Sequence, residues 1–200
     1  SHKRTKPNRI ELVVVDRFAG SQSLGVAVRR IARKVRNKAI VHYVGLDLQE
    51  HVYSSNQKQW VRNVLADMEQ LGGEDMWKLA QEVVKTRTGR TTKLHLLMVS
   101  MSPCCKTFSK TDSINVSKGH NFRLHNKDTP TKPPKDDVSE KGKEAMHADK
   151  VVQGEIKVAR WCQKKGASMY MENPVGSLFR REYMMHWEKE EWVKRETVHY

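Results

Sequence analysis

Short apolar runs alternate along the chain with longer stretches in which apolar residues recur at helical spacing. Residues 10–16, 39–45 and 94–101 are rich in Val, Ile and Leu, which is typical of strands buried on both faces. Apolar positions three and four residues apart predict helices over 24–35 and 74–86. This alternation predicts an α/β fold with a mostly parallel sheet and helices on both of its faces.

The second half of the chain changes character at residue 106. Residues 106–143 are rich in Lys, Ser, Thr, Asp and Pro, and they predict a long basic loop because proline excludes regular structure. A helix is predicted over 143–165, followed by a short strand at 167–171 and a short helical stretch near the end. Residues 60–67 fit either a third strand or the end of a helix.

Length and charge indicate one domain with a polyanionic partner. We expect residues 1–9 to be a basic tail and residues 10–200 to be the domain. The 37 Lys and Arg residues exceed the 23 Asp and Glu residues, giving a formal net charge of +14 that favours nucleic acid as the partner. No apolar run approaches the ~18 residues of a membrane span, and the first residues lack a signal-peptide core, so an intracellular protein is expected, in nucleus or cytoplasm.

The cysteines favour reactive chemistry over a structural role. An odd count and the adjacent pair Cys104 and Cys105 argue against a disulfide framework, and no zinc-type Cys/His spacing predicts a metal site. Cys105 lies in a turn after a buried strand and beside Lys106, which favours the thiolate, although a buried apolar role is the alternative. Cys162 lies within a predicted helix and is expected to be buried.

Reactive residue types stand at the ends of successive predicted strands. In parallel α/β folds the carboxyl ends of the strands hold the ligand sites. The residues at these ends are Asp16, Asp47, Asp67, Cys105 and Glu172. Gly20 lets a backbone approach a ligand, and Asp47 is placed to bind a ribose, with a turn glycine and a helix-capping carboxylate as the structural alternatives.

Three segments together resemble C5-cytosine methyltransferases. Residues 16–21 (Asp-Arg-Phe-Ala-Gly-Ser) resemble the Asp-Leu-Phe-Ala-Gly-x-Gly motif of that family. Residues 102–109 (Ser-Pro-Cys-Cys-Lys-Thr-Phe-Ser) are similar to its Pro-Pro-Cys-x-x-Phe-Ser loop. Residues 171–178 (Met-Glu-Asn-Pro-Val-Gly-Ser-Leu) resemble its Glu-Asn-Pro/Val motif in the form of small phage-type members. The motifs occur in family order, and the resemblance covers about residues 10–200.

The resemblance implies a Rossmann-like class I fold and a covalent methyl transfer from S-adenosylmethionine to C5 of cytosine. Counted back from Phe108, the family's nucleophile falls on Cys105, while Cys104 replaces its second proline and Arg17 replaces its leucine. Glu172 would protonate N3 of the base, and Asn173 beside it can read the edge of the base.

The resemblance also implies where the cofactor binds. Phe18 would stack on the adenine, Gly20 would approach the methionine moiety, Asp47 would bind the ribose and Asp67 the adenine amine. The full set of expected cofactor-binding residues is Asp16, Phe18, Ala19, Gly20, Ser21, Asp47, Leu48, Asp67 and Pro103. S-adenosylhomocysteine is the expected product.

The substrate and the completeness of the site stay open at this point. DNA is the leading substrate, with the 106–143 loop as a clamp over a flipped cytosine. RNA methylation by the same chemistry and a non-catalytic nucleic-acid-binding relic are the alternatives. Family members continue past a strand like residues 198–200, so we expect the C-terminal part of the family fold to be missing, with target recognition supplied by a partner chain or by that region.

Overall fold

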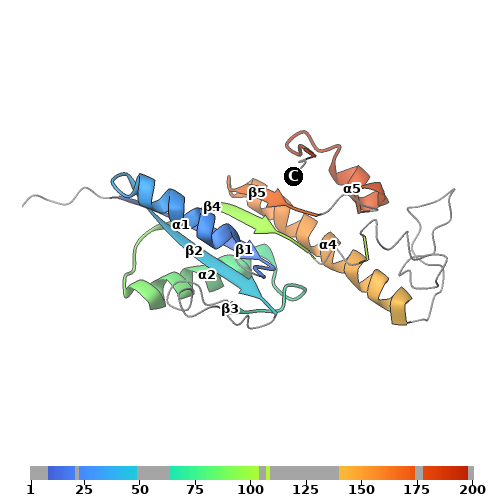
Figure 1. Cartoon of the computed structure of the whole chain (residues 1–200), viewed down its shortest axis with the longest axis horizontal. Helices are drawn as coiled ribbons and strands as arrows, with labels where there is room; N and C mark the ends of the chain where they lie inside the picture. The colour runs from blue at the N-terminus through green and yellow to red at the C-terminus, as the bar shows by residue number, and fades with distance from the viewer. Residues whose placement is uncertain are drawn as a thin grey trace, which may run out of the picture. The chain divides into compact units, whose positions relative to one another are not determined.

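The chain folds as an α/β protein around a parallel sheet (Figure 1). The computed structural model describes residues 9–20, 23–48, 64–103, 107–108, 140–173 and 178–197. The elements in these residues are β1 (Ile10–Arg17), α1 (Ser23–Val35), β2 (Ala39–Asp47), β3 (Val64–Leu65), α2 (Gly73–Thr88), β4 (Leu94–Met101), α4 (Glu140–Lys164), β5 (Ser168–Met171), η2 (Leu178–Arg180) and α5 (Glu182–Trp187).

The five strands run parallel in the order β3-β2-β1-β4-β5. Asp16 near the end of β1 pairs with Gly45 of β2 on one side and with Ser100 of β4 on the other. From β1 the chain continues into β2 and β3 on one side, and then crosses back to add β4 and β5 on the other side. The carboxyl ends of β1 and β4 therefore flank a topological switch point, where open α/β sheets bind ligands.

Both faces of the central strand are covered, as predicted. Val13, Val14 and Val15 are consecutive in β1 and therefore point to alternate faces, yet each is at most 3% exposed. On one face α1 packs so closely that a Cβ atom at Gly25 would lie 2.9 Å from the ring of Tyr43 in β2. The α/β fold with a parallel sheet and flanking helices is thus confirmed.

On the other face, α2 and the end of α4 make a close contact. A Cβ atom at Gly73 would lie 2.5 Å from the Trp161 ring, so the indole lies directly on the start of α2. The Trp161 Nε1–H donates to Glu74 at 3.3 Å, and the Lys165 ammonium lies 5.4 Å from the Trp161 ring centroid. Gly73 is required here because any side chain would push the two helices apart.

The predicted helix over 143–165 is present as α4, with one boundary corrected. Val152, Ile156, Ala159 and Cys162 recur at helical spacing and are buried, so the structural role expected for Cys162 is confirmed. The helix begins at Glu140, so the end of the predicted 106–143 loop is helical. Glu140 and Lys143 form an ion pair at 2.7 Å across this first turn, which favours helix there.

Several other predicted segments lie only partly within the described residues. Of the segment 60–67, residues 64–65 form the short strand β3, and residues 60–63 lie outside the described residues. The same holds for the tail 1–8, for most of the predicted loop (109–139) and for residues 198–200. Among the described helices, none combines the length and the apolar character that crossing a bilayer requires.

The chain divides into two compact units. The first comprises residues 1–101 and 158–171 and contains the whole sheet, whereas the second comprises residues 102–157 and 172–200. In the second unit the Arg181 guanidinium donates to Asp149 at 2.8 Å and the Tyr183 hydroxyl donates to the same carboxylate at 2.7 Å. These buried contacts fix the segment around α5 to α4.

Candidate functional site

The turn after β1 has an unusual backbone that brings it close to the end of β2. Phe18 has φ +62° and Gly20 has φ +45°, in the left-handed region that glycine tolerates and other residues enter with strain. The Ala19 N–H donates to the Leu46 carbonyl at 3.0 Å, and the Gly20 N–H donates to Asp47 Oδ2 at 2.9 Å. The structure thus brings together Phe18, Ala19, Gly20 and Asp47 of the predicted cofactor set.

Asp16 is held by the neighbouring strands. The Tyr43 hydroxyl of β2 donates to its carboxylate at 2.7 Å, and Ser100 of β4 also hydrogen-bonds to it. Burial raises the pKa of the Asp16 carboxyl, and the negative charge of Asp47 raises it further, while the two hydrogen bonds oppose that shift. A buried carboxyl with a raised pKa at a strand end is typical of functional sites.

The remaining expected cofactor residues of the first unit differ in their surroundings. Leu48 is 68% exposed, so it offers an apolar surface beside Asp47. Asp67 is exposed, and its Oδ1 accepts the backbone N–H of Glu69 at 3.0 Å, which makes it the start of a local turn. Ser21 lies outside the described residues.

Arg17 has a role that the sequence did not reveal. It is 0% exposed, and its guanidinium donates to the carbonyls of Met68 and Leu71, each at 3.0 Å. These bonds hold the loop between β3 and α2, which carries Asp67, against the end of β1. The departure from the family's leucine was visible in the sequence, but the carbonyls that Arg17 bonds could be found only in the folded chain.

In the second unit, two of the three motifs meet. The side-chain amide of Asn173 donates to the Pro103 carbonyl at 3.2 Å, although 70 residues separate them. Pro103, Thr107 and Phe108 are buried, which anchors both ends of the predicted nucleophile loop. Cys105, like Cys104 and Lys106, lies outside the described residues.

Glu172 and Asn173 differ in exposure. Glu172 follows β5 directly and is exposed to solvent. The Asn173 Oδ1 atom is buried and has no hydrogen-bond partner in the described part of the chain. A buried acceptor without a donor is unfavourable, and a ligand that carries an amino group would satisfy it.

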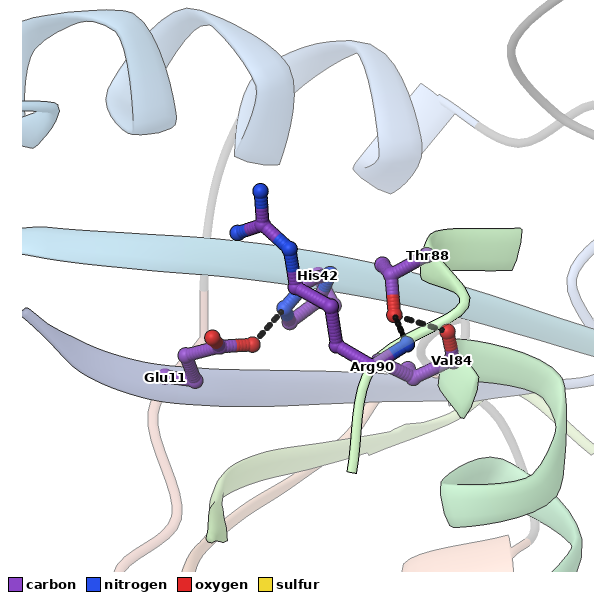
Figure 2. Close-up of polar contacts among 5 residues, drawn as sticks. All are labelled: Glu11, His42, Val84, Thr88 and Arg90. Carbon is purple, nitrogen blue, oxygen red and sulfur yellow. Dashed lines mark hydrogen bonds and ion pairs between the residues drawn. The ribbon is translucent and has the colours of Figure 1, made fainter. Parts of the chain in front are cut away.

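A polar cluster near the amino ends of the strands was not predicted from the sequence. Figure 2 shows Glu11 of β1 bonded to His42 Nε2 of β2 at 2.8 Å. Burial alone would raise the pKa of Glu11, but hydrogen bonds from His42 and Thr92 and the charges of His42 and Arg90 together lower it. The pair joins the amino-terminal halves of two adjacent strands, and its partners are 31 residues apart in the sequence.

The end of α2 lies next to this cluster (Figure 2). The Thr88 hydroxyl donates to the Val84 carbonyl at 2.8 Å and accepts the Arg90 N–H at 3.3 Å. Gly89 has φ +64° and its N–H donates to the Lys85 carbonyl, which is a left-handed helix end. These bonds direct the chain from α2 into β4.

The described residues contain no group of three or more His, Cys, Asp or Glu side chains arranged to hold a metal ion. Comparison with protein-family models, with curated proteins and with solved structures found no match for this chain.

Proposed function

We propose that this protein transfers a methyl group from S-adenosylmethionine to C5 of cytosine in DNA, with Cys105 as the nucleophile. The hydrogen bond from Asn173 to the Pro103 carbonyl carries the proposal. It joins the residue after Glu172 to the residue two positions before Cys105, so the proton donor and the nucleophile come from adjacent segments. The reaction requires such adjacency because both groups must reach one cytosine ring at the same time, the nucleophile at C6 and the proton donor at N3.

The turn after β1 supports a nucleoside cofactor at the switch point of the sheet. The left-handed backbone at Phe18 and Gly20 keeps the turn narrow, and the Asp47 carboxylate lies beside it. In the proposed complex Phe18 packs on the adenine, Asp47 accepts hydrogen bonds from the ribose and Gly20 admits the methionine moiety. Tyr43 and Ser100 hydrogen-bond to Asp16, which stands near the end of β1 and so supports the start of the turn.

S-adenosylmethionine supplies the methyl group when it is bound. The Cys105 thiolate adds to C6 of the cytosine, and the Glu172 carboxyl donates its proton to N3, which makes C5 nucleophilic. After C5 has taken the methyl group, a base removes the C5 proton, the C6–S bond breaks to restore the Cys105 thiolate, and N3 returns its proton to the Glu172 carboxylate. The buried Oδ1 of Asn173 is available to accept a hydrogen bond from an amino group of the base.

A mechanism-based trap tests the nucleophile. Duplex DNA carrying 5-fluorocytosine should form a covalent complex with the protein in the presence of the cofactor, because fluorine blocks the final proton loss. Cys105→Ser should abolish this complex, and Cys104→Ser, the matched control, should leave it. Glu172→Gln should slow trapping by roughly two to four orders of magnitude. Trapping that survives Cys105→Ser contradicts the assignment.

Calorimetry tests the cofactor site separately. Asp47→Ala should weaken the binding of S-adenosylmethionine by about 1–3 kcal/mol, because a charged hydrogen-bond acceptor is lost. Asp75→Ala removes an exposed carboxylate from α2 and should leave binding unchanged. If the intact protein binds no cofactor, the catalytic proposal fails and a non-catalytic nucleic-acid-binding role is favoured.

Transfer of a labelled methyl group distinguishes the substrates. The proposal expects incorporation into duplex DNA and little into a structured RNA. Incorporation into RNA alone would keep the chemistry and change the substrate class.

A further inference from the structure

Many exposed basic side chains gather where the chain enters the strands of the sheet. Because all five strands are parallel, the segments that enter β1, β2, β4 and β5 lie at one edge, opposite the turn after β1 (Figure 1). We call this edge the basic edge. It is defined by Arg9, Arg33, Lys34, Arg36, Lys38, Lys85, Arg87, Arg90, Lys93, Arg160, Lys164 and Lys165, all of which are exposed.

The basic edge holds most of the excess positive charge of the protein. Its segments, residues 9–10, 33–38, 85–93 and 160–167, contain twelve Lys and Arg residues and no Asp or Glu. The formal net charge of the whole chain is +14, so the remaining residues are nearly balanced.

Several cations of the basic edge have partners that leave their charge in place or offset it only in part. Arg9 donates to the Arg36 carbonyl and Arg87 to the Tyr43 carbonyl, and neither bond removes a charge. Glu74 lies 3.6 Å from the Lys165 ammonium, and the charge of Arg90 helps to lower the pKa of the buried Glu11. Like charges gathered in this way repel one another, and a bound polyanion relieves that repulsion.

The dimensions of the edge suit a duplex backbone. Neighbouring strands lie about 4.8 Å apart, so the edge from β2 to β5 spans roughly 14 Å. A DNA duplex carries one charge per ~1.7 Å of axis, so that span faces about eight phosphates. Trp161 is the aromatic residue within these segments, and it packs on Gly73 and beneath Lys165.

We propose that the basic edge binds the phosphate backbone of duplex DNA without reading its sequence. The inference does not depend on methyl transfer. The eight residues of β1 separate the two edges by roughly 26 Å at ~3.3 Å per residue. A duplex bound at the basic edge is therefore a contact separate from that of a base held at the cofactor turn. Such an anchor raises the local concentration of DNA and depends steeply on salt.

Lysine-to-glutamine variants test the proposal with equal changes of charge. The basic-edge variant combines Lys38→Gln, Lys93→Gln and Lys164→Gln, one from each of three connecting turns. The control variant combines Lys150→Gln, Lys189→Gln and Lys194→Gln, which are exposed and belong to none of these segments. Far-UV circular dichroism confirms that both variants keep the fold.

Fluorescence anisotropy with a duplex of about 20 base pairs of arbitrary sequence, between about 50 and 200 mM NaCl, gives the readout. Each lost phosphate contact should weaken binding roughly five- to tenfold near 0.1 M salt and lower the log–log salt slope by about 0.9. The basic-edge variant, which loses three contacts, should therefore bind roughly 100- to 1,000-fold more weakly, and the control variant should change much less.

Equal losses in the two variants would overturn the proposal, because binding would then follow net charge rather than this surface. A loss confined to anionic phospholipid vesicles or to an RNA hairpin, with duplex DNA affinity unchanged, would overturn it as well. The basic-edge variant should still bind S-adenosylmethionine, which calorimetry measures. Failure of the methyltransferase proposal and failure of this one are therefore separable.

Discussion

Replacement of Arg17 by leucine tests whether a buried cation holds the loop beside the cofactor site. The guanidinium is 0% exposed and donates to the carbonyls of Met68 and Leu71, each at 3.0 Å. A buried acceptor that loses its donor costs about 1–3 kcal/mol, and a partly buried one less because water can reach it. The apolar surface that leucine buries offsets part of this loss.

The net effect of Arg17→Leu should therefore be a decrease of about 2–3 kcal/mol in the free energy of unfolding. Domains are stable by about 5–15 kcal/mol, so the loss is easily measured by urea unfolding followed by tryptophan fluorescence. Arg17→Lys keeps the charge but has fewer hydrogen-bond donors. Its free energy of unfolding should lie between those of the wild type and Arg17→Leu. Buried ion replacements are sometimes neutral or stabilising, and an Arg17→Leu protein as stable as the wild type would refute this reasoning.

Three further changes follow from the structure. Burial raises the pKa of the Asp16 carboxyl, so its contribution to the free energy of unfolding is complete below about pH 3.8 and is lost as the pH rises through the folded-state pKa. Asp16→Asn should therefore flatten the decline in the free energy of unfolding from about pH 4 upward. Gly73→Ala should destabilise the protein by about 1–3 kcal/mol in urea unfolding, because the new methyl group meets the Trp161 ring at 2.5 Å. Asp149→Ala leaves the buried Arg181 guanidinium without its carboxylate and should lower the thermal midpoint, at a cost of about 3–5 kcal/mol, while a wild-type midpoint would show that the pair contributes little.

The sequence by itself determined the elements and the class of the fold. Runs such as 10–16 and 94–101 predicted β1 and β4 because a strand buried on both faces needs apolar residues at consecutive positions. Helical spacing predicted α2, and Cys162 was correctly predicted to be buried because its neighbours form an apolar stripe. These features are local, since each depends on side chains within a few turns or residues of one another.

The candidate site was only partly within reach of the sequence. Strand ends identified Asp16 and Asp47, and the structure places both at the carboxyl edge. It also shows that the Tyr43 hydroxyl donates a hydrogen bond to the Asp16 carboxylate and that Glu172 is exposed. Neither fact follows from position in the chain. A side chain's exposure and partners depend on which strands become neighbours.

Only the tertiary structure decided which distant residues act together. The order β3-β2-β1-β4-β5 brings His42 to Glu11, and folding of the β3–α2 loop gives Arg17 its carbonyls. The same parallel order gathers the basic edge from segments more than 100 residues apart in the chain. The charges of these segments were visible in the sequence, but their common position was not, because parallel pairing is set by contacts between segments rather than by the pattern within any one of them.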